Sequence, residues 1–114
     1  MGKLYMGFDA GTQSVKVAVY DEQFRLVTSR SLPTSLTYPQ PGWVEMDVHT
    51  YLDNCVVCMA ETTSELRRLG FDPKDVSAIM GDGIICGIVG IDENADPVTP
   101  YINYLDSRTM ADVE

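Results

Sequence analysis

The stretch that decides the fold is DAGTQSVK, residues 9–16. Its turn-forming residues separate two segments of strand-like composition, residues 3–8 and 15–20, and this arrangement predicts a β-hairpin. A second turn at residues 21–23 leads to residues 24–32, a further β-branched and apolar segment that ends before a proline. We therefore expect an antiparallel meander of three strands at the start of the chain.

An extended loop and a long helix follow the predicted meander. Residues 33–42 contain three prolines and a glycine, which is typical of a surface loop. Asp47 suits an N-cap, and Gly70 is placed to end the helix that Asp47 begins. Apolar residues recur between them at spacings of three and four, which predicts one apolar stripe. The stripe consists of Val48, Tyr51, Leu52, Cys55, Val56, Met59, Leu66 and Leu69.

The second half of the chain predicts further strands. Residues 76–80 have the composition of a buried strand, which GDG at residues 81–83 would break. Residues 84–91 and 98–105 predict two more strands, and a helix is expected from Asp106 or Ser107. Three strands, a helix and further strands together predict an α/β fold.

Residues 9–16 also carry groups that suit a bound phosphate. Glycine permits positive φ and a close approach of the backbone, and successive N–H groups can point at phosphate oxygens. A carboxylate at a strand end can hold magnesium through its water shell, and a lysine can offset negative charge. An ordinary hairpin turn has the same composition, so the residues alone leave both interpretations open. The candidate nucleotide-binding residues are Asp9, Gly11, Thr12, Gln13, Ser14 and Lys16, with Asp9 also as the magnesium ligand.

A phosphate-binding turn between the first two strands of a meander resembles the hairpin of the actin and sugar-kinase superfamily. Within it the chain resembles the FGGY carbohydrate kinases, the group of xylulokinase, glycerol kinase and gluconokinase. PGWVEMD at residues 41–47 is similar to that family's P-G-W-x-E-x-D, and INYLDSRT at residues 102–109 to its I-x-W-x-D-x-R-T. IMGDGIICG at residues 79–87 occupies the place of the xylulokinase pattern I-x-x-S-G-Q-M-H-G, although Ile84 and Cys86 replace its Gln and His.

The resemblance implies a set of sugar-binding residues: Asp82, Gly83, Tyr104, Asp106 and Arg108. Tyr104 stands where the family often has Trp, and its ring could pack on the apolar face of a sugar. Asp106 and Arg108 suit bonds to sugar hydroxyls, but equally a helix cap with a supporting salt bridge. Asp82 suits a polar contact to substrate, or an ordinary β-turn. The loss of the Gln and His weakens the inference that D-xylulose is the substrate.

The resemblance also implies how much of the protein the chain represents. Residues 1–114 correspond to the N-terminal part of the first of two actin-like, RNase H-like domains in a kinase of several hundred residues. The rest of that domain and the second domain would follow. The helical pattern from Ser107 reaches Glu114 without a stop signal, which favours the same conclusion. No catalytic residue is expected here, because the base and the adenosine-binding segments of such kinases lie later, so the 114 residues alone should be inactive.

The function implied is transfer of the γ-phosphoryl group of ATP to a hydroxyl of a sugar or polyol, with Mg²⁺ and a xylulose-like acceptor. Two alternatives from other classes remain: a non-enzymatic actin-like nucleotide switch, and an inactive homologue that binds a sugar. PGWVEMD and the LDSR sequence at residues 105–108 favour the kinase over the switch, because a switch would need no sugar pocket.

Composition limits the partners. The net charge is −9 and the eight Lys and Arg residues are scattered, which argues against nucleic acid and anionic membranes. The longest uncharged apolar run, residues 83–91, is too short to cross a bilayer. Three cysteines predict a reducing compartment, the cytoplasm, and Cys55 and Cys58 are expected to be buried side chains rather than metal ligands. A small-molecule substrate is therefore expected, and an uncovered apolar face would favour a homodimer.

Overall fold

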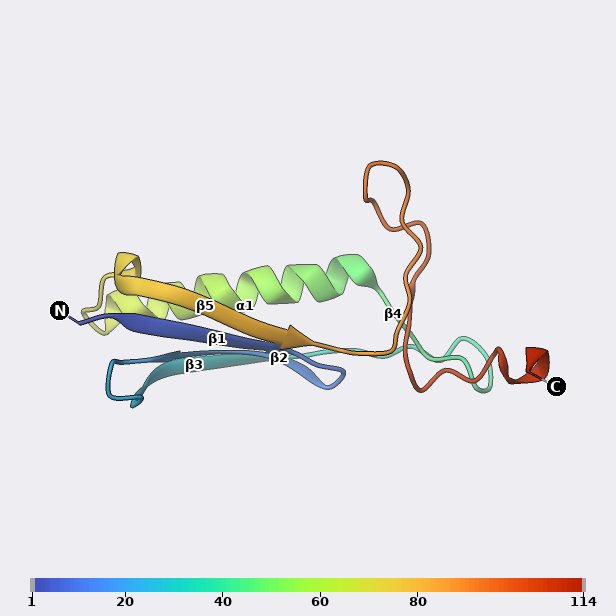
Figure 1. Ribbon diagram of the computed structural model, residues 1–114, viewed down its shortest axis with the longest axis horizontal. Coiled ribbons are helices and arrows are strands. Elements are labelled where there is room, and N and C mark those ends of the chain that lie inside the picture. Colours follow the sequence, from blue (N-terminus) through green and yellow to red (C-terminus); the bar gives the residue numbers. More distant parts are fainter. Residues whose placement is uncertain (1, 114) are drawn as a thin grey trace.

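The computed structural model describes residues 2–113, which form a four-stranded sheet with one long helix on one face (Figure 1). The strand order is β3-β2-β1-β5, in which β1, β2 and β3 are antiparallel neighbours and β5 runs parallel to β1. The predicted meander and the α/β class are confirmed. The strands are β1 (Leu4–Ala10), β2 (Ser14–Tyr20), β3 (Leu26–Pro33) and β5 (Val76–Gly83).

The third strand begins two residues later than predicted, at Leu26. The cause is the carboxylate of Asp21, which accepts hydrogen bonds from the N–H of Gln23 at 2.9 Å and of Arg25 at 3.0 Å. Phe24 consequently lies in the turn with a φ of 57°, so it cannot join the ladder.

The helix α1 (Val48–Arg68) begins and ends as predicted. Its N-cap is Asp47, whose carboxylate accepts a hydrogen bond from the N–H of Thr50 at 2.7 Å. Its C-cap is Leu69, and Gly70 follows with a φ of 88°, a conformation that few other residues adopt.

The core lies between α1 and the inner face of the sheet. The predicted apolar stripe is only partly correct, because Leu52 and Val56 are exposed whereas Cys58 and Thr62 are buried. The reason is that α1 packs over β2 and β3, so the side of the helix that faces β5 has no covering element in the described part of the chain. The buried apolar core consists of Leu4, Met6, Ala10, Val15, Val17, Val19, Cys58 and Leu66.

The strand β5 follows a short 3-10 helix, η1 (Pro73–Asp75), and differs from the prediction in two ways. It continues through the GDG sequence to Gly83, because it pairs with β1 along its whole length, as far as Ala10 opposite Gly83. It is also mostly exposed rather than buried, because no strand among the described residues pairs with its outer edge. A Cβ at position 81 would overlap the ring of Phe8, so glycine is the residue that fits there without a shift of that ring.

Two of the predicted strands are largely absent. Residues 84–91 form no strand: Cys86 adopts a φ of 59°, and only isolated bridges occur, such as Ile88 with Ile102. Residues 98–105 contribute only β6 (Tyr101–Ile102), which pairs with β4 (Glu45–Met46), since prolines at positions 97 and 100 lack the N–H that a ladder needs. Figure 1 shows the resulting arm projecting from the body in orange.

The helix predicted from Asp106 or Ser107 is also wrong, apart from a 3-10 turn, η2 (Met110–Asp112). The N–H of Ser107 donates to the carbonyl of Gly42 at 2.7 Å, and the N–H of Arg108 donates to the Asp106 carboxylate at 2.9 Å. These bonds divert the backbone from a helical pattern. The last residue of that prediction, Glu114, lies outside the described residues. Within residues 2–113, no helix has the length and apolar character needed to cross a membrane.

Candidate functional site

The turn between β1 and β2 is held in place from several sides. The N–H of Gly11 donates to the carbonyl of Ser14 at 3.0 Å and so closes the turn. Thr34, just after β3, supports it: its N–H donates to the carbonyl of Gln13 at 2.9 Å, and its hydroxyl donates to the carbonyl of Gly11 at 3.3 Å. From the helix side, the hydroxyl of Tyr51 donates to the carbonyl of Ala10. Burial raises the pKa of Tyr51 to about 12, so this donor keeps its proton at physiological pH.

Two backbone donors of this turn remain available. The N–H groups of Thr12 and Gln13 have no protein acceptor among residues 2–113, whereas the N–H of Gly11 is used within the turn. Adjacent free N–H groups can bind an anion. One expectation was wrong, because Gly11 does not adopt positive φ.

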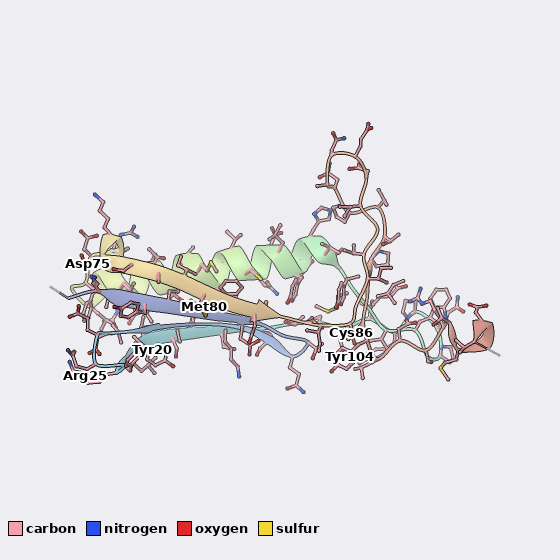
Figure 2. All side chains as sticks on the ribbon, in the orientation of Figure 1. Tyr20, Arg25, Asp75, Met80, Cys86 and Tyr104 are labelled. Carbon is pink, nitrogen blue, oxygen red and sulfur yellow. The ribbon has the colours of Figure 1, made fainter. Side chains whose placement is uncertain are left out.

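The turn borders a recess of about 450 Å³, which we call the hairpin recess. It brings the phosphate-side candidates Gly11 and Thr12 together with the sugar-side candidates Gly83 and Tyr104. Figure 2 shows Cys86 and Tyr104 close together where β5 leads into the coil. The ring of Tyr104 is half exposed. The recess is completed by Ile84, Ile85 and Cys86.

A second hollow, of about 480 Å³, lies on the sheet face opposite α1 and holds the charged candidates. Asp9 is in register with Lys16 on β2 and with Asp82 on β5, so the three side chains form a row across the sheet. The alternative of a β-turn aspartate at position 82 is wrong. The pKa of Asp82 is raised mainly by its hydrogen bond with the Asp9 carboxyl, and to a smaller extent by the negative charge of Asp9.

The residues around Asp9 fit magnesium bound mainly through water. Among residues 2–113 there is no group of three or more His, Cys, Asp or Glu side chains arranged to hold a metal ion. Magnesium commonly keeps several waters and uses one or two protein carboxylates together with substrate phosphates. Asp9, which is exposed and in register with Asp82 near the end of β1, matches that mode of binding.

Asp106 and Arg108 do not line the hairpin recess; they bind one another. The Nη2 of Arg108 lies 2.7 Å from Asp106 and 2.8 Å from Glu45, and its guanidinium lies over Trp43, 3.9 Å from the ring centre. We call these four residues the Arg108 clamp. Hydrogen bonding with Arg108 is the main cause that lowers the pKa of Asp106 strongly, and the bond with Asp106 likewise raises the pKa of Arg108. The alternative of a supporting salt bridge is thus present, although Asp106 caps a turn and not a helix.

Sequence reasoning missed two parts of this region. It gave Glu45 no role, because nothing in a single sequence shows that residue 45 lies against residue 108. It also did not predict that Ile85 would line the recess, because residues 84–91 were expected to be a strand. The expectation of buried cysteines is confirmed for Cys58, which is fully buried against the sheet, whereas Cys55 is only partly buried. Burial raises the pKa of both thiols.

The chain has the α/β, actin-like fold of solved carbohydrate kinases. The chain matches xylulose kinase from Rhodospirillum rubrum with a TM-score of 0.86 and 26% identity, over 97% of this chain and 22% of that one. Residues 4–114 match the family model described as the N-terminal domain of the FGGY family of carbohydrate kinases, so the chain belongs to that family.

Relatives of known sequence agree with this assignment. A probable glycerol kinase of Caenorhabditis elegans is 31% identical over 110 residues, which cover 95% of this chain and 22% of the relative. An uncharacterized sugar kinase of Archaeoglobus fulgidus is 46% identical over 106 residues, or 90% of this chain and 19% of the relative. The chain therefore spans about a fifth of the length of the curated relatives that it matches.

Proposed function

We propose that the full-length protein containing this chain transfers the γ-phosphoryl group of ATP to a hydroxyl of a sugar or polyol, with a xylulose-like ketose as the first acceptor to test. The observation that carries the proposal is the hairpin recess, in which the turn with free N–H groups and the Tyr104 ring border the same space. Phosphoryl transfer depends mostly on positioning and charge neutralisation, which such a recess can supply.

The residues of the turn and its two flanking strands would bind the phosphates of ATP. Thr12 and Gln13 would donate N–H groups to phosphate oxygens, with Gly11 and Ser14 shaping the turn. Lys16 would offset phosphate charge, and Asp9 would hold the hydrated magnesium ion. Magnesium, when bound, would neutralise charge on the phosphates.

The acceptor side consists of Gly83 and Tyr104, which line the recess directly. Asp82 lies in register with Asp9, so its predicted contact to the sugar would place the acceptor close to the phosphate side. The catalytic base would come from a part of the protein beyond residue 114. The free cysteines are consistent with the proposed cytoplasmic location.

The test is an ATP-dependent phosphorylation screen of the full-length protein with pentuloses, tetritols, glycerol and aldonates, with Asp9→Asn as the control. We expect one acceptor class to be phosphorylated by the wild type and not by the variant. Magnesium-dependent ATP hydrolysis that no acceptor stimulates would instead favour the nucleotide switch. ATP or sugar binding without any product would favour the inactive homologue.

A further inference from the structure

Tyr104 reaches the hairpin recess from a short turn, residues 103–107, that has little secondary structure of its own. Asn103 anchors this turn: it is almost fully buried, its N–H donates to the carbonyl of Val44 at 2.9 Å, and its side-chain oxygen accepts from the N–H of Leu105 at 3.0 Å. The position of the Tyr104 ring therefore depends on how firmly residues 103–107 are held against the loop before α1.

The Asp106 carboxylate ties the turn to that loop. It accepts a hydrogen bond from the N–H of Val44 at 2.6 Å, and the N–H of Ser107 donates to the carbonyl of Gly42 at 2.7 Å. The side chain of Asp106 is only 3% exposed, so its charge needs a partner inside the structure.

Arg108 supplies that partner and joins three segments. Its Nε lies 2.9 Å from one oxygen of Asp106, its Nη2 contacts both Asp106 and Glu45, and its guanidinium stacks on Trp43. The Arg108 side chain is 19% exposed and that of Glu45 is 14% exposed, so solvent screens these ion pairs less than the surface pairs of α1. A planar guanidinium can make all these contacts at once, whereas a lysine ammonium cannot.

We infer that Arg108 is a positioning residue for the acceptor site: it holds the 103–107 turn, and thereby the Tyr104 ring beside Gly11 and Thr12, without touching the acceptor itself. The geometry separates the two roles, because Tyr104 lines the hairpin recess and Arg108 does not. The inference rests on the proposed function for its kinetic consequences, but the clamp itself is independent of that function.

The kinetic test compares Arg108→Lys with Arg68→Lys in the full-length protein. Arg68 pairs with Glu65 on the exposed side of α1 and is a matched control. Arg108→Lys should raise the KM for the acceptor about tenfold, with kcat and the KM for ATP changed less than twofold. Arg68→Lys should change none of the three. An unchanged acceptor KM would overturn the inference, and so would a rise in the KM for ATP as large as the rise in the acceptor KM.

A double-mutant cycle shows whether Arg108 acts through the ring. In a Tyr104→Ala background, Arg108→Lys should change the acceptor KM less than twofold, because the ring that it positions is gone. Fully additive effects would overturn the inference. Should Arg108→Lys fold poorly, Glu45→Gln removes only one partner of the guanidinium and should change the acceptor KM in the same direction by a smaller factor.

Hydrogen exchange tests the clamp without any enzymatic readout. The amides of Val44, Asn103 and Ser107 should exchange at least tenfold faster in Arg108→Lys than in the wild type, with α1 unaffected. Unchanged exchange of these amides would overturn the inference. If the wild type phosphorylates no acceptor, the proposed function fails while the exchange result still decides whether the clamp holds the turn.

Discussion

Asp82 has the least favourable electrostatic position of the residues in the candidate site. Its carboxylate stands directly across the ladder from that of Asp9, and the pKa of Asp82 is raised from its ordinary value near 3.8. Such a carboxyl binds more protons in the folded state than in the unfolded chain. Protonation of Asp82 therefore contributes to the stability of the fold in full below about pH 4, and this contribution is lost as the pH rises through the raised pKa.

Asp82→Asn should remove this pH dependence. We expect the variant to be more stable than the wild type at pH 7, and the difference to shrink as the pH falls toward 4, because the repulsion between the two carboxylates is then absent from both proteins. Urea unfolding of both proteins at several pH values, in the presence of a chelator, measures this difference in stability. Glu93→Gln, on an exposed loop turn, is the control and should change nothing. A variant less stable than the wild type at pH 7 would contradict the expectation.

At the scale of elements, the N-terminus of α1 depends on one side chain. Asp47 accepts the hydrogen bond from the N–H of Thr50, which would otherwise lack a partner within the helix. Asp47→Ala should lower the free energy of unfolding by about 1 kcal/mol, and Asp47→Ser should retain most of it, since serine also caps helices. Urea denaturation of the three proteins checks this, and equal midpoints for Ala and Asp would refute it.

The pairing of β5 with β1 brings position 81 against the ring of Phe8. A Cβ on Gly81 would overlap the Phe8 ring, whereas a Cβ on Gly7 would come no closer than 3.9 Å to the carbonyl of Met80. Gly81→Ala should therefore destabilise the fold by roughly 1–3 kcal/mol, as overpacking does. Gly7→Ala, the matched control in the neighbouring strand, should be neutral or slightly stabilising. Equal unfolding midpoints for the two variants would show that Phe8 moves aside without cost.

The elements that sequence could predict are those fixed by local signals. The hairpin turn, the Asp47 cap and the glycine after α1 each depend on residues close in the chain, and all three are confirmed. Residues 84–105 could not be predicted correctly, because their conformation depends on distant pairings such as that of Ile102 with Glu45. The prediction that the GDG sequence at residues 81–83 breaks the strand is wrong for the same reason. The sequence pairs with β1, and Gly81 lies against the ring of Phe8.

The residues of the candidate site could likewise be predicted only in part from the sequence. Gly11, Thr12, Gly83 and Tyr104 were named from motifs far apart in the sequence, and the structure brings them to one recess. Asp106 and Arg108 lie outside the recess, because their charges are satisfied by each other and by Glu45. A single sequence shows residue types but not their partners, so a binding residue and the residue that positions it look alike.

At the scale of the whole molecule, the 114 residues form an elongated body of 59 × 29 × 19 Å with one sheet face uncovered in the described range. The outer edge of β5 is free there, contains no Lys, Arg or Pro, and carries the exposed side chains of Ile79 and Met80. Unprotected edges of this kind pair with other strands.

The 114-residue chain alone should therefore associate through β5, which would account for the homodimer expected from sequence. Sedimentation equilibrium should give a mass above that of the monomer. Met80→Lys should shift the equilibrium toward monomer, whereas Met110→Lys, at another exposed methionine that lies away from the edge, should not. A monomeric wild type would contradict this.

The most direct test of the hairpin's role is steady-state kinetics of Asp9→Asn in the full-length protein with its preferred acceptor. If Asp9 acts on the phosphate side, kcat should fall by roughly a hundredfold or more while the acceptor KM changes less than twofold. An equal loss in both parameters, or full turnover by the variant, would contradict the assignment of this hairpin to phosphate binding.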